Sequence, residues 1–233
     1  KQVFPEKSEA QAMESLWEAI FCAVRIQDGD AVQAWREHDA LLSEKCEILN
    51  KYQFAELHYE NEAGTDFRVG LVKNHIWEGG SEESGSGVRF IANMPTEEVF
   101  TMPDYRKAEG KVVSSRPLSY RGNLIKDFSL TFHEGKVVDF DAREGYDALK
   151  QLLDTDEGSK SLGEVALVPY ASPISEMGIL FYNTLFDENA SCHLALGECY
   201  PTTVQDGEKM NEEELHQIGG NHSINHVDFM IGT

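Results

Sequence analysis

A histidine and an aspartate stand two residues apart near the end of the chain, where apolar and polar residues alternate. Residues 227, 229 and 231 are apolar and alternate with His226, Asp228 and Met230, which predicts a strand with one face in the core. Residues i and i+2 of a strand point to the same side, so His226 and Asp228 share the other face. An imidazole and a carboxylate presented together can bind a cation. The alternative is a structural pair whose members satisfy each other's hydrogen bonds.

A second candidate is the carboxylate of Glu164, which interrupts the short apolar strand predicted over residues 163–168. Burying a carboxylate is costly unless it is paired or bound to a metal. A cation would remove that cost by supplying positive charge. Alternatively, Glu164 lies at the solvent-exposed end of the strand, because element boundaries are uncertain from sequence.

The segment 183–193 adds two acids and a histidine. We expect Asp187 to cap a helix that runs to about Leu196 and ends at Gly197, and Asp187 and Glu188 suit the positive end of the helix dipole. His193 would then lie on the helix, where a lone histidine is usually a polar surface group or a satisfied core residue. Neighbours on a helix point about 100° apart, so Cys192 and His193 are not expected to form a nucleophilic pair.

The fourth segment is 93–100, in which Glu97 and Glu98 follow Pro95 and Thr96. On its own this pattern is typical of a helix start, and it does not distinguish Glu97 from Glu98. The His-Glu-x-x-His, phosphate-loop and Gly-x-Ser-x-Gly motifs are missing from the sequence. Carboxylates and two histidines spread over four segments are nevertheless what a two-metal hydrolytic site requires, with one carboxylate bridging ions about 3.5–4 Å apart.

Two helices are predicted before these segments. Ser8 and Gln11 form a capping box, and the apolar stripe that contains Met13 and Trp17 is expected to face the core. Residues 28–30 interrupt the helical pattern, and Asp30 is expected to cap a second helix that continues to about Leu49.

From about residue 54 the apolar period changes to two. Hairpins are predicted over residues 57–71 and 128–140, and residues 79–87 are expected to form a flexible, solvated loop. Helices are predicted over 146–153 and from the Asn211–Glu214 capping box to Gly219. We therefore expect an α+β fold with a helical segment at 1–52, an antiparallel, barrel-like middle, and a mixed metal-binding C-terminal part, residues 53–233 forming the catalytic domain.

The charge balance excludes some partners. The 233 residues carry 41 acidic and 20 basic side chains, a formal charge of −21, which argues against nucleic acid and against an anionic membrane surface. Most of the acids, including residues 78–83, are expected to be solvated surface. No apolar run approaches the roughly 18 residues of a membrane span. Four cysteines without a Cys-x-x-Cys pair indicate a reduced, cytoplasmic chain.

Several stretches carry a family resemblance. The chain resembles the aminopeptidase T / aminopeptidase S (aminopeptidase II) family of metal-dependent exopeptidases, and the resemblance covers about residues 50–233. The matching stretches, in family order, are Asn93-Met-Pro-Thr-Glu-Glu-Val-Phe-Thr, Asp156-Glu-Gly, Leu162-Gly-Glu-Val-Ala-Leu-Val-Pro, Ser172-Pro-Ile-Ser, Phe181-Tyr-Asn-Thr-Leu-Phe-Asp-Glu-Asn-Ala-Ser-Cys-His-Leu-Ala-Leu-Gly and His226-Val-Asp-Phe-Met-Ile-Gly.

The resemblance implies a set of metal ligands, with Glu164 as the bridge, Glu188 as the sixth ligand and Tyr200 as an active-site tyrosine. The ligands are Glu98, Glu164, Glu188, His193, His226 and Asp228. It also implies two divalent ions per active site (Zn, Co, Mn or Mg), peptide substrates and a homodimer. Family members are longer at both ends, so an N-terminal domain and a short C-terminal tail are expected to be missing here.

These observations predict a dinuclear aminopeptidase that removes N-terminal residues from peptides with a metal-activated water, Glu98 and Tyr200 taking part in catalysis. One rival is a metal-stabilised binding or assembly module that is inactive without the missing domain. Another is metal-free acid–base hydrolysis by paired carboxylates, as in glycosidases.

Overall fold

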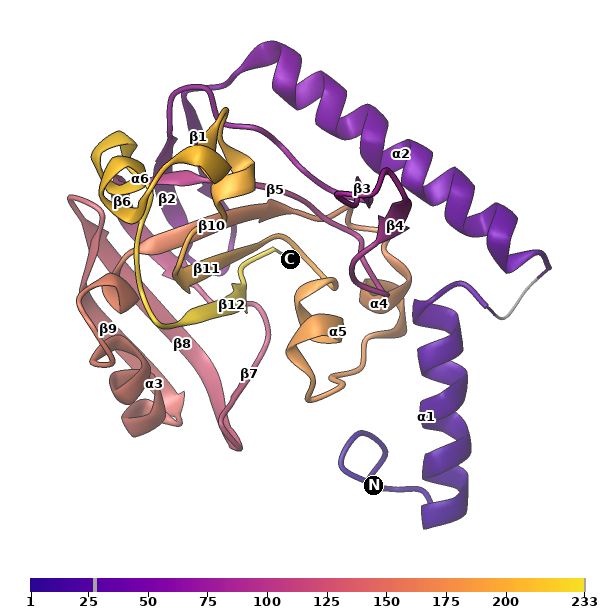
Figure 1. Ribbon diagram of the computed structural model, residues 1–233. Coiled ribbons are helices and arrows are strands. Elements are labelled where there is room, and N and C mark those ends of the chain that lie inside the picture. Colours follow the sequence, from indigo (N-terminus) through magenta and orange to yellow (C-terminus); the bar gives the residue numbers. More distant parts are fainter. Residues whose placement is uncertain (27–28, 233) are drawn as a thin grey trace.

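The computed structural model describes residues 1–26 and 29–232. Two helices, α1 (Glu9–Ala23) and α2 (Ala31–Tyr52), lie along one side of the β structure (Figure 1). The predicted Ser8–Gln11 capping box and the Asp30 cap are both present. The predicted break between the helices falls partly outside the described residues, because residue 28 is not among them.

The larger sheet has six antiparallel strands in the order β1-β2-β6-β8-β7, with β9 paired to β8. Both predicted hairpins, β1–β2 and β8–β9, are confirmed. The predicted helix over residues 146–153 is also confirmed as α3 (Tyr146–Leu153), which packs on β8 and β9. The six strands are β1 (Glu56–Glu60), β2 (Asp66–Leu71), β6 (Pro103–Val113), β7 (Leu118–Tyr120), β8 (Asn123–His133) and β9 (Lys136–Glu144).

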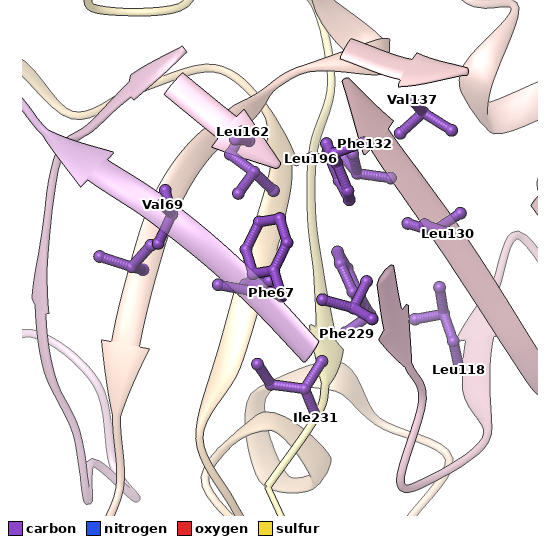
Figure 2. Packing of buried hydrophobic residues seen from close by; sticks show 14 of the residues in the cluster. Phe67, Val69, Leu118, Leu130, Phe132, Val137, Leu162, Leu196, Phe229 and Ile231 are labelled. Carbon is purple, nitrogen blue, oxygen red and sulfur yellow. The ribbon is translucent and has the colours of Figure 1, made fainter. Parts of the chain in front are cut away.

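The smaller sheet has four antiparallel strands in the order β12-β11-β10-β5. These are β5 (Val99–Thr101), β10 (Leu162–Leu167), β11 (His193–Gly197) and β12 (His226–Met230). One face of this sheet packs on the larger sheet. Figure 2 shows the contact between Leu162, Leu196 and Phe229 of the smaller sheet and Phe67, Leu130 and Phe132 of the larger one. The opposite face of the smaller sheet is left for polar residues.

The connections are short helices and turns. They are α4 (Pro173–Met177), α5 (Thr184–Glu188), α6 (Glu212–Ile218) and the 3₁₀ turns η1 (Gly158–Lys160), η2 (Pro201–Thr203) and η3 (Gly207–Lys209). The capping box predicted for α6 is present, and α6 ends at Gly219 as predicted. No described helix is both long enough and apolar enough to span a bilayer.

The mixed α/β character is confirmed, but three expectations about the fold are wrong in whole or in part. The sheets do not close into a barrel among the described residues. Residues 79–87 contain a strand, β3 (Ser81–Glu83), which pairs with β4 (Arg89–Ile91). The stripe on α1 faces the core only in part: Met13 and Trp17 are 59% and 51% exposed. Other members of the stripe, Leu16 and Ile20, pack against a cluster that contains Ala19 and Ala23 of α1 and Ile174 of α4.

Candidate metal centre

The polar face of the smaller sheet gathers acids and imidazoles around a small central residue. Ala195 in β11 is paired with Glu164 on one side and with Asp228 on the other. Since alternate residues share a face, His193 lies on the same face as Ala195, and His226 on the same face as Asp228. The methyl group of Ala195 leaves the space between the two carboxylates open.

Two groups of side chains meet on this face, and each could hold a metal ion. The first consists of Glu98, Glu164 and His193, and the second of Glu164, His226 and Asp228. Within each group the donor atoms lie within 4.8 Å of one another. His193 Nε2 is 2.7 Å from Glu98 Oε2 and 3.7 Å from Glu164 Oε1. His226 Nε2 is 3.7 Å from Glu164 Oε2. Glu164 therefore turns one oxygen toward each histidine.

The backbone fixes both imidazole rings. Nδ1 of His193 lies 3.1 Å from the carbonyl oxygen of Ser191, and Nδ1 of His226 lies 2.8 Å from that of Glu198. A carbonyl can only accept, so each Nδ1 carries the proton and donates. In the neutral ring Nε2 is then an unprotonated acceptor that faces the carboxylates. This arrangement of an imidazole held by an outer hydrogen bond is typical of metal-binding histidines.

Several polar atoms of the site are buried and face only other members of the site. Among the described residues, Glu98 Oε2, His193 Nε2 and Asp228 Oδ1 are buried without a hydrogen bond to the surrounding protein; His193 Nε2 faces Glu98 Oε2 at 2.7 Å, and Asp228 Oδ1 lies 3.5 Å from His226 Nε2. Buried polar atoms are normally paired, because an unpaired one costs free energy. Carboxylate oxygens and imidazole nitrogens are the ligands that Zn, Mn and Co accept. The donor set and its unpaired atoms therefore fit divalent cations.

The acids of the site carry more negative charge than the histidines offset. Burial, together with the charges of Asp228 and Glu98, raises the pKa of Glu164 to about 8. Burial and then Asp228 raise the pKa of Glu188 to about 10. Glu188 ends α5, which packs on β12. Both carboxyls are thus held in an environment that only positive charge makes favourable for the ionised form.

The same charges raise the pKa values of the two histidines, which favours their protonated form. Burial alone would lower the pKa of His193, but Glu98, Asp228 and Glu188 raise it well above the ordinary value. For His226, the effect of burial is exceeded by Asp228 and Glu164, and its pKa rises to about 9. In the metal-free chain the imidazoles therefore take up part of the positive charge that the acids require.

The site opens into a pocket of about 350 Å³. Tyr200 lies on its wall, with its ring centroid 4.7 Å from that of His226 and 6.0 Å from that of Phe100. Glu78 and Glu82 also line the pocket. Glu82 is exposed, as expected for residues 78–83, but Glu78 is partly buried, so the expectation of solvated surface is wrong for Glu78. The sequence held no signal for Glu78, because its β-bridge with Phe100 brings it to the site.

Two local predictions at the site are also wrong. His193 lies on the strand β11 and not on a helix, because α5 ends at Glu188 and residues 193–197 pair with β10 and β12. Residues 93–98 do not start a helix: a cis Met94–Pro95 bond turns the chain into β5. The structure also separates the two neighbouring acids. Glu98 faces His193, whereas Glu97 is buried in an ion pair with Arg25 on the other side.

Comparison with known proteins matches the whole chain. The model of the thermophilic metalloprotease (M29) family matches residues 1–233. Aminopeptidase AmpS of Bacillus subtilis is 54% identical over 232 residues, which are 100% of this chain and 56% of that protein. Aminopeptidase T of Thermus aquaticus is 44% identical over 233 residues, again 100% of this chain and 56% of that protein.

Solved structures agree with the family match. Wild-type AmpT from Thermus thermophilus superimposes with a TM-score of 0.90 at 44% identity, covering 99% of this chain and 55% of that one. A 2,5-dihydroxypyridine dioxygenase from Pseudomonas putida is similar in fold alone, with a TM-score of 0.54 at 18% identity and coverage of 91% of this chain and 56% of that one. The chain spans about half the length of the relatives it matches. It belongs to the thermophilic metalloprotease (M29) family.

Proposed function

We propose that the chain carries the active site of a dinuclear metal-dependent aminopeptidase, which removes N-terminal residues from peptides. The observation that carries the proposal is the place of Glu164, whose two oxygens face two separate groups of potential ligands. Glu98 and His193 would hold one ion, His226 and Asp228 the other, and Glu164 would be shared by both groups. Glu188 would be the sixth ligand.

Two divalent ions at these residues would supply a Lewis acid for the scissile carbonyl and a water of lowered pKa as the nucleophile. The chain's own residues would then orient the substrate and move protons. Tyr200 keeps its proton at neutral pH, because burial and then Glu164 and Asp228 raise its pKa above the ordinary value. Its hydroxyl would donate to the oxyanion that develops on the carbonyl oxygen, and a carboxylate of the site would carry the proton released by the attacking water to the leaving amine.

The acidic character of the pocket supports exopeptidase specificity. Glu78 and Glu82 line the pocket together with the proposed ligands. Thr202 Oγ1 donates a 2.7 Å hydrogen bond to Glu78 Oε2 and fixes that carboxylate. A peptide N-terminus carries a positive charge, which carboxylates in a confined pocket attract. An acylated N-terminus lacks this charge, and we expect it to be a poor substrate.

Metal content and peptide hydrolysis test the proposal together. The protein is treated with a chelator, desalted, and reconstituted in turn with Zn, Co, Mn or Mg, and bound metal is counted by elemental analysis. Activity is measured on aminoacyl-amides and on their N-acetylated forms. We expect two ions per chain, activity that disappears on chelation and returns with metal, and loss of turnover in His226→Ala. Glu62→Gln, at an exposed position in the β1–β2 turn, is the matched control.

Each outcome distinguishes between the candidate functions. Hydrolysis that survives chelation and desalting would exclude the metal mechanism and favour acid–base catalysis by carboxylates. Metal binding without hydrolysis would indicate a metal-stabilised module. As further parts of the proposal, the cysteine usage suggests a cytoplasmic protein and the family resemblance suggests a homodimer. Fractionation of cells checks the first, and light scattering on the purified protein checks the second.

A further inference from the structure

Glu97 lies beside the proposed ligand Glu98 but is directed to the opposite side, into a buried ion pair. Nη1 and Nη2 of Arg25 donate to the two oxygens of Glu97, the second over 2.8 Å. The Glu97 side chain is only 2% exposed. A bidentate guanidinium–carboxylate pair fixes orientation as well as distance. The ion pair therefore holds the backbone from which the Glu98 side chain projects.

Arg25 is itself held firmly at the end of α1. It has a φ of +55°, a left-handed conformation that non-glycine residues rarely adopt. Its guanidinium lies 5.7 Å from the ring centroid of Trp35. Trp35 Nε1 in turn donates a 2.7 Å hydrogen bond to the carbonyl of Val24. The start of α2 thus supports the residue that pairs with Glu97.

A second contact ties the same backbone to the other side of the site. The N–H of Glu97 donates a 2.6 Å hydrogen bond to Oδ1 of Asn189, a residue with no exposed surface. Nδ2 of Asn189 donates to the carbonyl of Leu185 at 2.8 Å. Asn189 directly follows Glu188, another proposed ligand. One amide side chain therefore links the backbone beside Glu98 with the backbone beside Glu188.

The contacts of Glu97 with Arg25 and Asn189 are not explained by a gain in the stability of the fold. A buried ion pair contributes little net stability, because the cost of removing both charges from water offsets their attraction. Its attested benefit is a specific geometry. Here the geometry is that of the segment carrying Glu98, which has no regular helix of its own and only joins β5 at Val99.

We propose that Arg25 and Asn189 are positioning residues for the metal centre, acting through Glu97 on the placement of Glu98. This inference rests on the proposed function, in which Glu98 is a metal ligand. Loss of an outer hydrogen bond to a metal ligand weakens metal binding by about 10–100-fold in known sites. We expect a loss within that range for the ion held by Glu98, Glu164 and His193. The Arg25 variants should leave the ion held by His226 and Asp228 unchanged, whereas Asn189→Ala also removes a contact beside Glu188.

The experiment is a competition titration of the whole chain with a chromophoric chelator, which resolves the two ions without measuring activity. The variants are Arg25→Ala, Asn189→Ala and the double variant Arg25→Met with Glu97→Gln, which removes the ion pair without leaving a buried charge alone. Arg68→Ala is the control, because Arg68 also pairs with a glutamate, Glu56, but both side chains are about half exposed. Thermal melting of each metal-free variant, with and without added Zn, separates folding from binding.

We expect the two Arg25 variants to bind one ion like the unmodified chain and the other about 10–100-fold more weakly. Asn189→Ala should weaken the same ion by at least as much, and all three variants should show a smaller metal-induced rise in Tm. Arg68→Ala should match the unmodified chain. Unchanged affinity for both ions in the folded variants would overturn the positioning role and leave the proposed function intact. An unmodified chain that binds no metal would overturn both. If Arg25→Ala fails to fold, the double variant and Asn189→Ala decide.

Discussion

The acids of the metal centre predict that the metal-free protein loses stability as the pH rises. Glu164 has a pKa of about 8 in the folded chain, against 4.5 for an ordinary glutamate, because of burial and the charges of Asp228 and Glu98. Between these values the folded state binds a proton that the unfolded state has released. The free energy of unfolding therefore falls as pH rises across this range. At about 1.4 kcal/mol per tenfold change, the loss at Glu164 is about 5 kcal/mol.

His226 adds to the effect with the same sign. Although burial alone would lower it, Asp228 raises the pKa of His226 from 6.5 to about 9. A histidine whose pKa is higher in the folded state contributes stability below its unfolded pKa. That contribution is lost as the pH rises through the folded value. The metal-free chain should thus become steadily less stable from about pH 4.5 to pH 9.

Bound metal should reverse the trend, because ligands must lose their protons to bind it. Urea unfolding at about pH 5, 6.5 and 8, with chelator and with saturating Zn, measures both slopes. In Glu164→Gln we expect a metal-free chain more stable at pH 8 than the unmodified one, with most of the metal-induced gain removed. Glu62→Gln should behave as the unmodified chain. Metal-free stability that rises between pH 5 and 8, or the same slope in Glu164→Gln, would refute the electrostatic reasoning.

Three further substitutions test the site and its support. Tyr200→Phe should keep both ions but lower kcat by about 10²–10³, as the loss of an oxyanion donor does, and an unchanged kcat would remove Tyr200 from catalysis. Asp156→Ala should cost about 1–3 kcal/mol in urea unfolding, because its carboxylate accepts from the Ile224 N–H and the Ser223 hydroxyl; equal stability would show that water replaces it. Phe229→Ala should cost about 3–5 kcal/mol, since Phe229 is 1% exposed between the sheets, and a loss below 1 kcal/mol would contradict that packing.

Local sequence patterns predicted much of the fold. The capping boxes of α1 and α6 and the two hairpins follow from neighbouring residues, and the structure has them as predicted. His193 was assigned to the wrong element because a short apolar run fits a helix and a buried strand equally well. Pairing with β10 and β12 decides between them, and those partners are distant in sequence.

Contacts between residues distant in sequence also limit what the sequence predicts about the site. The face shared by His226 and Asp228 follows from strand period, and the structure places both on one face of β12. Glu97 and Glu98 could not be told apart, because the ion pair that directs Glu97 away from the site is made by Arg25, which is distant in sequence. The predicted stripe on α1 is only partly buried for a related reason: a helix pattern marks an apolar side, but not which of its residues the neighbouring elements cover.

The strand pairing of Ala195 limits how far the geometry of the metal centre can change. Its two pairing partners, Glu164 and Asp228, are carried by strands on either side of β11, and neighbouring strands in a sheet keep a spacing of about 4.8 Å. The separation of the two backbone positions is therefore set by hydrogen-bonded strands, with Leu194, Leu196 and Phe229 anchoring the reverse side. Only rotation of the Glu164 and Asp228 side chains can then change the distance between their oxygens, because the strands that carry them are tied to β11 on both sides.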